Sequence, residues 1–361
     1  MASYSFVTLW QMNAPIERVW DAVYHSERWP EWWPGVERVI ELQPAADNGL
    51  GGRQRYVWKS ILPYRLTIDM ATSRVEPPFV LEGQASGELE GTGRWELSRD
   101  DGLTTARCIW TVTTTKPWMN LVAPLARPLF EWNHEIVMRQ GGDSLRRLLE
   151  GPSDADHVTG LKPDRLAYLE AAGWRAYYNR QWVRALWLMV QLAREQFGLP
   201  WLRAAQAAYD ITRAMIAWAP AKNNPVRAQS FISAFYRVAR AYGQRQRFDP
   251  EAVAKLELDY WRIHRELSGR PNSEKRPLED VLERLHSALF GVSPEQARPS
   301  ARNRARAADT VDVITSRQST DVALDWCRAE SYLRSAYRSL SVDWQQRDAE
   351  ARADQIELMD R

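Results

Sequence analysis

The sequence predicts an α+β domain, with a curved antiparallel sheet packed around one long helix, followed by an all-α domain. Two patterns carry this prediction. Before Pro117, about seven segments alternate apolar and polar side chains, as strands with one buried and one wet face do. From Pro117 onward, apolar residues recur at helical spacing and no strand pattern returns.

The length and composition set broad limits. At 361 residues the chain is long enough for two ordinary domains. A 45% hydrophobic and 26% charged composition is typical of a soluble globular protein. A net charge of +2 does not indicate a nucleic-acid-binding surface. The 18 tryptophans are unusual, and they indicate large aromatic surfaces that are buried or that contact a ligand.

The cysteines and the N-terminus bear on the compartment. Cys108 and Cys327 fall in different predicted domains, which argues against a disulfide and favours a reducing compartment. No basic segment followed by an apolar one opens the chain, and no run approaches about 18 uncharged apolar residues. We therefore expect a cytoplasmic protein that is neither secreted nor membrane-spanning.

The chain begins with a strand pattern from Tyr4 to Met12, followed by a short amphipathic helix. We expect Asn13 to cap this helix and Pro15 to lie in its first turn. The apolar positions of the helix are Ile16, Val19, Trp20 and Val23. Two prolines and a glycine within residues 30–35 then turn the chain sharply.

The sheet pattern follows this turn. A strand is predicted from Val36 to Leu42, and residues 47–52 form a turn rich in residues that accept positive φ. Each later segment places its aromatic and aliphatic side chains on one face. Those side chains are Tyr56, Trp58, Tyr64, Leu66, Ile68, Met70, Trp95, Leu97, Cys108, Trp110 and Val112.

One long helix closes this half of the chain and ends at Glu150. Pro124 and Pro128 indicate that its regular part starts near Leu129. A sheet that curls around a single helix buries its aromatic face but does not fill the space between them. We therefore expect an elongated apolar cavity there.

The rest of the chain is predicted to be helical. Residues 1–150 form the first domain, 151–158 a polar linker, 159–345 the all-α domain and 346–361 a polar tail. Prolines open most of the helical segments, as the first helical position favours. The predicted segments are 163–179, 182–197, 200–218, 225–242, 250–267, 277–290, 294–314 and 321–340.

Residues 1–150 resemble the START-like SRPBCC superfamily, which includes polyketide cyclase/dehydrase and lipid-transfer proteins. The resemblance rests on Ala14-Pro15-Ile16-Glu17-Arg18-Val19-Trp20, on Trp29-Pro30-Glu31-Trp32-Trp33-Pro34-Gly35, on the strand succession with Gly87 to Trp95, and on the closing helix through Leu149. It implies a helix-grip fold around a cavity for hydrophobic small molecules. The helical half resembles helical regions of uncharacterised bacterial proteins, which imply no activity.

Aromatic residues are the candidate lining of that cavity. In this fold the apolar face of the sheet is both core and pocket wall. The candidate ligand contacts are Tyr56, Trp58, Tyr64, Leu66, Trp95, Trp110 and Phe130. Trp32 and Trp33 are expected at the pocket mouth, where they either gate entry or close the helix turn against the sheet.

Glu131 and His134 are the candidate catalytic residues. Residues three apart share a helical face, so the two side chains suit an acid/base pair or two metal ligands. The alternative places Trp132, Ile136 and Val137 toward the cavity and leaves Glu131 and His134 nearer its edge.

Three further motifs lie in the helical half. For Glu283 and His286 we favour a solvated carboxylate with a histidine near a helix end. The set Glu257, Tyr260, Trp261 and His264 suits either a polar pocket or packing around a buried hydrogen bond. Five arginines within residues 298–317 suit phosphates, lipid head groups or an acidic partner, although a solvated helix face beside Asp309 and Asp312 is favoured.

These observations lead to one main functional hypothesis and two alternatives. The main one is binding or transport of a hydrophobic small molecule such as a lipid, isoprenoid or polyketide. The alternatives are a polyketide cyclase/dehydrase-type enzyme that uses Glu131 and His134 as acid and base, and an adaptor whose helical half docks partners. No cofactor, metal or nucleic acid is expected. Peripheral membrane contact and a protein partner for the helical half are further hypotheses.

Overall fold

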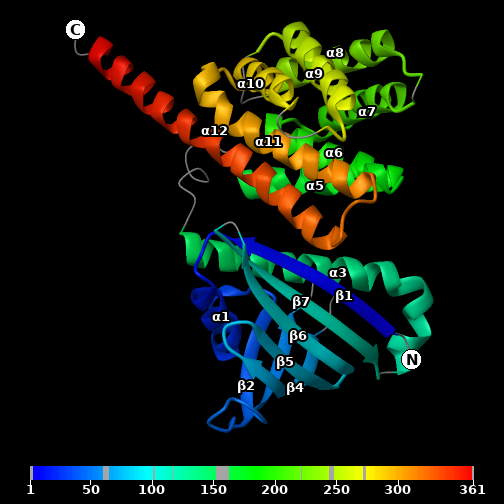
Figure 1. The fold of residues 1–361 in the computed structure, drawn as a ribbon, viewed down its shortest axis with the longest axis vertical. Helices are drawn as coiled ribbons and strands as arrows, with labels where there is room; N and C mark the ends of the chain where they lie inside the picture. The colour runs from blue at the N-terminus through cyan, green and yellow to red at the C-terminus, as the bar shows by residue number, and fades with distance from the viewer. Residues whose placement is uncertain are drawn as a thin grey trace. The chain divides into compact units, whose positions relative to one another are not determined.

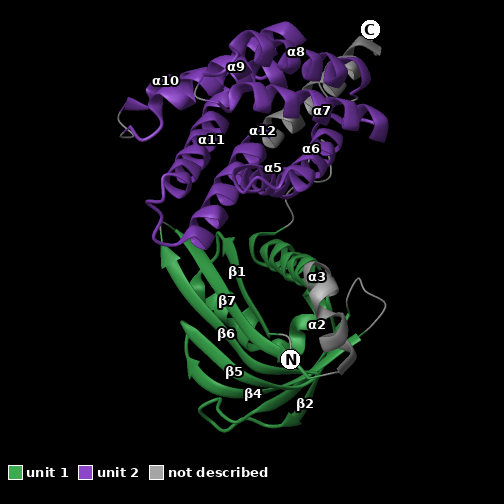
Figure 2. Cartoon of the chain, turned by 90° about the vertical axis from the view of Figure 1, so that its right-hand side faces the viewer, with its two compact units in different colours: residues 1–153 green, residues 154–361 purple. Residues whose placement is uncertain are grey.

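The chain folds into two units, residues 1–153 and residues 154–361, in the computed structural model (Figure 2). The predicted two-domain layout is thus confirmed. The structure describes residues 3–59, 65–100, 102–115, 117–151, 162–220, 222–243, 248–270 and 274–359, without the side chains of residues 117–129 and 341–359.

The first unit contains the predicted curved antiparallel sheet. Its seven strands have the order β1-β7-β6-β5-β4-β3-β2, so the first and last strands pair side by side (Figure 1). The strands are β1 (Ser3–Met12), β2 (Val36–Gln43), β3 (Arg53–Lys59), β4 (Arg65–Glu76), β5 (Val80–Gly87), β6 (Leu89–Asp100) and β7 (Leu103–Thr114). Alternation of side chains along each strand gives the sheet one apolar face, which the long helix covers.

Short helices link the two edge strands β1 and β2. They are α1 (Ile16–Tyr24), the 3₁₀ turn η1 (Ser26–Arg28) and α2 (Trp29–Trp32). The N-cap of α1 is Pro15, and its carbonyl accepts hydrogen bonds from the N–H groups of Arg18 and Val19. Asn13 was the expected cap, and that prediction is wrong. Its backbone N–H instead donates to Oε1 of Glu150 at 2.8 Å, which ties this corner to the end of the long helix.

The long helix α3 spans Pro117–Glu150. The prediction that its regular part starts near Leu129 is wrong, since the backbone is helical from Pro117 onward. A proline inside a helix removes one hydrogen bond and bends the helix, but it does not have to end it.

Tryptophans form the centre of the first unit's core. Trp10 lies 5.1 Å from Trp33 and 4.8 Å from Trp95, measured between ring centroids. The indole N–H of Trp33 donates to the carbonyl of Val137 on α3 at 2.9 Å. The indoles pack directly on the α3 backbone, because Gly141 and Gly142 carry no side chain there.

The second unit is all helical, as predicted. Its helices are α5 (Pro163–Tyr178), α6 (Trp182–Phe197), α7 (Trp201–Trp218), α8 (Pro225–Tyr242), α9 (Pro250–Leu267), α10 (Arg276–Phe290), α11 (Pro294–Thr315) and α12 (Val322–Met359). The side chains of Asn224, Asp249 and Ser293 cap α8, α9 and α11. The segment predicted as a polar tail is helical up to Met359, because alanine, glutamate, glutamine and arginine favour helix there.

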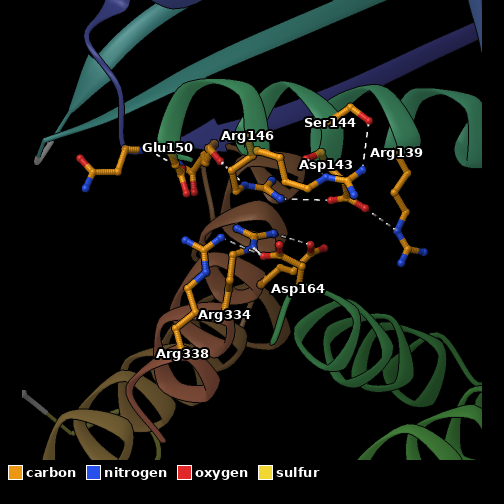
Figure 3. Close-up of polar contacts among 12 residues, drawn as sticks. Arg139, Asp143, Ser144, Arg146, Glu150, Asp164, Arg334 and Arg338 are labelled. Atoms are coloured by element: carbon orange, nitrogen blue, oxygen red, sulfur yellow. Dashed lines mark hydrogen bonds and ion pairs between the residues drawn. The ribbon is translucent and has the colours of Figure 1, made fainter. Parts of the chain in front are cut away.

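The last helix packs back against the first helix of this unit. Arg334 Nε lies 2.7 Å from Asp164 Oδ1, and Arg338 Nη2 lies 3.3 Å from the same oxygen (Figure 3). Since Arg334 is almost fully buried, this carboxylate also satisfies a charge inside the unit. No helix in the part of the chain that the structure describes is long and apolar enough to cross a bilayer.

The arginines of residues 298–317 are in part exposed, with Arg302, Arg306 and Arg317 at the surface, and Arg304 is the exception. Arg298 and Arg302 pair with glutamates of α10 at 3.0 and 3.6 Å. Arg304 pairs with Glu170 of α5 at 2.6 Å, and its side chain is only 16% exposed. The favoured interpretation is therefore wrong for Arg304, while Arg298 and Arg302 remain 42% and 53% exposed and pair with α10 at the surface.

The Glu283–His286 pair also differs from its favoured interpretation. Glu283 is largely buried, with its carboxylate on Arg298. His286 is 4% exposed and packs edge-on against Phe290. Both residues lie inside the unit because α10 presents this face to α11 rather than to solvent.

Gly141→Ala is expected to destabilise the first unit by about 1–3 kcal/mol, because the new methyl group would overlap the rigid Trp33 indole. This loss outweighs the gain of roughly 1 kcal/mol in helix propensity. Urea unfolding measures the difference. The control is Gln140→Ala, at the exposed neighbouring position, with an expected change below about 0.5 kcal/mol. A Gly141→Ala variant as stable as the wild type would contradict the close packing.

Candidate functional site

A cavity of about 320 Å³ lies between the apolar face of the sheet and α3. All seven strands contribute lining residues, and α1, η1, α2, α3 and the loops next to them supply the others. Much of the wall is aromatic or aliphatic, and polar side chains from the short helices, α3 and several strands also contribute to it. This is the geometry of a small-molecule site: a concave apolar surface with a few convergent polar groups.

Most of the predicted ligand contacts line this cavity. Those that do are Tyr56, Trp58, Leu66, Trp95, Trp110, Phe130 and Trp33. Tyr64 lies outside the described residues. Trp32 does not line the cavity and stacks on Trp33, with ring centroids 5.5 Å apart.

Trp33 is a fixed part of the wall and not an exposed gate. It is 1% exposed and hydrogen-bonded to α3. Of the two expectations for the turn tryptophans, this packing supports closure of the helix turn against the sheet.

One end of the cavity carries a hydrogen-bonded polar group of three side chains. The Tyr56 hydroxyl lies 2.7 Å from both Ser26 Oγ and Gln54 Oε1, and Ser26 donates to Gln54 at 2.5 Å. Burial raises the pKa of Tyr56 to about 12, so this phenol keeps its proton at neutral pH. Sequence reasoning missed Ser26 and Gln54, although Gln54 shares the inward face of β3 with Tyr56 and Trp58 by simple alternation.

His134 lies inside the cavity and Glu131 does not. The imidazole stacks on Phe6 of β1 with ring centroids 4.0 Å apart. Its Nε2 is buried and has no hydrogen-bond partner within the described part of the chain. Burial lowers the pKa of His134 to about 4, which leaves the ring neutral at physiological pH. Glu131 is exposed and absent from the cavity wall, so the predicted acid/base pair does not converge there.

The cavity-facing stripe of α3 also differs from the alternative expectation. Trp132 is 47% exposed and lies outside the cavity. Ile136 does not line the cavity, Val137 does as that alternative expected, and Phe130, His134 and Met138 line it as well. These residues repeat at three- and four-residue steps, as one helix face requires.

The cavity offers neither a metal site nor a reactive thiol. Among the described residues no group of three or more histidine, cysteine, aspartate or glutamate side chains could hold a metal ion. Cys108 lines the wall, but burial raises the pKa of its thiol to about 12. A thiol in this state is a small apolar wall residue and not a nucleophile.

Comparison with known families agrees with this geometry. Residues 6–150 match the family described as "Polyketide cyclase / dehydrase and lipid transport". The N-terminal unit is a START-like SRPBCC domain. The match ends at residue 150, and the helical unit is not covered by a family.

Solved structures similar to this chain align with its N-terminal part. The di-domain ARO/CYC BexL is 20% identical, with 42% of this chain and 51% of BexL covered and a TM-score of 0.35. The Zhui aromatase/cyclase from a Streptomyces species is 14% identical, with 41% and 96% covered and a TM-score of 0.35. A START superfamily protein from Mycobacterium smegmatis is 13% identical, with 40% and 97% covered and a TM-score of 0.34.

The chain spans about half the length of the di-domain protein BexL. No curated protein matches the chain.

The low pKa of His134 predicts a pH dependence of stability. Between its folded value of about 4 and the ordinary value of 6.5, the unfolded chain binds a proton that the folded chain does not, so stability falls as the pH falls. From pH 7 to pH 5 we expect the wild type to lose about 2 kcal/mol more than His134→Gln in urea unfolding.

NMR titration of the His134 ring checks the same point directly. The expected midpoint is near 4. A midpoint near 6.5 would place the ring in water and remove it from the cavity wall.

Proposed function

We propose that the N-terminal domain binds a hydrophobic small molecule, such as a lipid, isoprenoid or polyketide, in the cavity under α3. The observation that carries the proposal is the wall itself, to which six of the seven strands, all except β2, contribute aromatic or aliphatic residues. The family description, which pairs polyketide cyclase/dehydrase with lipid transport, supports the same class of ligand.

Apolar desolvation supplies the binding energy. A ligand that buries roughly 300 Å² of apolar surface gains about 7 kcal/mol, before the loss of translational and rotational freedom is subtracted. Binding therefore depends mainly on how completely the ligand fills the cavity.

Two polar groups set the orientation of the ligand. The Ser26–Gln54–Tyr56 group can exchange hydrogen bonds with a ligand hydroxyl or carbonyl. The Nε2 atom of His134 offers a second polar contact on α3. A long apolar molecule with an oxygen function fits this arrangement better than a pure hydrocarbon.

A specific observation favours an enzyme of the cyclase type as the second candidate. His134 lines the cavity, and its Nε2 has no hydrogen-bond partner among the described residues. This nitrogen can accept a proton from a ligand, although burial lowers the pKa of His134 and makes it a weaker base than an ordinary imidazole. It would take a proton from the carbon beside a ligand carbonyl. The resulting enolate would attack a second carbonyl of the same chain, and the imidazolium would return the proton to the new alkoxide. Glu131 has no part in this step, because it lies outside the cavity.

Filling the cavity is expected to abolish ligand binding. Val112 is 2% exposed and lines the wall, so Val112→Trp should weaken binding of an apolar fluorescent probe to the full-length chain at least about tenfold. Val7→Trp is the matched control, since Val7 lies on β1 outside the cavity and is 48% exposed. Native mass spectrometry with organic extraction then identifies any molecule that co-purifies with the wild type but not with Val112→Trp.

Equal probe binding by the wild type, Val112→Trp and Val7→Trp would move the site out of this cavity. Thermal unfolding of each variant checks that it is folded, because overpacking alone costs about 1–3 kcal/mol.

His134→Ala separates binding from catalysis. If the domain is a cyclase, this variant keeps its affinity for a linear polyketide mimic and loses roughly 10²–10⁴-fold in turnover. Glu131→Ala is the control and should retain full turnover. Cyclisation at the wild-type rate by His134→Ala would exclude His134 as the base and leave the binding function.

A further inference from the structure

The helical unit contains a cavity of its own, with a volume of about 490 Å³. Helices α5 to α12 all contribute lining residues. The motif Glu257, Tyr260, Trp261 and His264 opens into it from α9. Of the two expectations for this motif, the placement supports a polar pocket between helices, and Glu257 also accepts hydrogen bonds there.

Aromatic rings form much of the wall. The cavity-lining rings include Trp174, Tyr177, Tyr178, Trp218, Tyr260 and Trp261. Guanidinium groups already lie over some of these faces. Arg265 lies 4.4 Å from the Trp218 ring centroid, and Arg304 lies 5.6 Å from that of Tyr260. The wall therefore suits positive charge, since an aromatic face attracts a cation.

One buried ion pair crosses this cavity wall. Arg304 Nη2 lies 2.6 Å from Oε1 of Glu170, and the Tyr337 hydroxyl donates to the other oxygen of Glu170 at 2.7 Å. The charges of Arg304 and Glu170 thus balance each other.

Glu257 has no such compensation. Its carboxylate accepts hydrogen bonds from Trp261 Nε1 at 2.8 Å and from the Tyr236 hydroxyl at 3.1 Å, and both donors are neutral. No cationic side chain of the described residues lies within ion-pair distance of it. Desolvation raises the pKa of Glu257, and the more distant Arg304 only partly opposes this. An enclosed carboxylate of this kind is stabilised by an incoming cation.

Buried polar atoms without a hydrogen bond lie on the cavity wall as well, and two of them belong to neutral side chains. Among the residues that the structure describes, His286 Nδ1 and Ser300 Oγ are buried and make no hydrogen bond, although both residues are more than nine-tenths buried. Buried polar atoms are almost always paired, with protein, water or a ligand. They offer hydrogen bonds to a polar substituent of a bound molecule.

We propose that this cavity binds an organic ammonium compound, with its charged nitrogen at Glu257 between the aromatic rings and its apolar body along the helices. The wall carries three carboxylates, Glu170, Glu257 and Asp312, and two guanidinium groups, Arg265 and Arg304. Glu170 already pairs with Arg304 and Asp312 lies 3.3 Å from His264, which leaves Glu257 for an incoming cation. A metal ion is disfavoured, because the described residues form no cluster of three metal-ligating side chains.

The experiment compares three ligands of similar shape and different charge on the full-length chain. Calorimetric titration with phenethylamine, phenylpropanol and phenylpropionate gives the affinity for a cation, a neutral analogue and an anion. We expect the amine to bind at least about tenfold tighter than the alcohol, and the carboxylate to bind most weakly.

Glu257→Gln keeps the shape of the side chain and removes its charge. It should weaken amine binding at least about tenfold and leave alcohol binding unchanged. Glu266→Gln, an exposed position on the same helix, should leave all three affinities unchanged. Val112→Trp should leave them unchanged as well, which separates this cavity from the one in the N-terminal domain.

Three results would overturn the proposal: no amine binding at millimolar concentration, equal affinity for amine and alcohol in the wild type, or full amine affinity in Glu257→Gln. The first two comparisons use only the wild type, so they decide the question even if Glu257→Gln does not fold.

Discussion

The close approach of α3 to the tryptophans of the first unit is the constraint on which its cavity depends. Gly141 leaves room for Trp33, and Gly142 leaves room for Trp10, so the C-terminal half of α3 lies directly on the core. The helix is thereby held at one end of the sheet. Toward Phe130 the contacts are between side chains, with His134 stacked on Phe6 and Phe130 edge-on to Tyr4, and the aromatic face of the sheet lines the cavity. Tight packing at one end and an open wall at the other produce a cavity rather than a solid core.

The helical unit depends on a different interaction. Small buried residues such as Ala204 and Ala301 let its helices approach closely, but such contacts do not specify which helices pair. Ion pairs fix which helices pack together. Arg304 joins α11 to Glu170 on α5. Arg334 joins α12 to Asp164, also on α5 (Figure 3). Breaking a buried pair of this kind costs about 3–5 kcal/mol, since the remaining charge has no partner. Arg304 and Glu170 also line the cavity, so this one pair contributes both to the packing of the unit and to the polarity of the site.

The features that could be predicted from the sequence are those that follow from the two-residue repeat of strands and the three- to four-residue repeat of helices. Alternation placed Tyr56 and Trp58 on the inner face of β3, and the structure finds them there. It could also have found Gln54, two residues earlier. It could not have found Phe6, whose position depends on the pairing of β1 with β7, opposite Trp110 and more than 100 residues away. Helical spacing likewise shows which residues share a face but not what that face meets, and for this reason Arg304 was expected in solvent.

The two cavities differ in how their polar groups are satisfied, and this difference bears on selectivity. In the N-terminal cavity Ser26, Gln54 and Tyr56 hydrogen-bond to one another, so these three side chains keep their hydrogen bonds when the cavity is empty. A ligand there gains mainly from apolar contact, and many molecules of similar shape can compete for the site. In the helical cavity Glu257 has only neutral donors, Trp261 and Tyr236, and His286 Nδ1 has no hydrogen-bond partner among the described residues. A site of that kind discriminates by charge, because a ligand without the matching group leaves buried polar atoms unpaired.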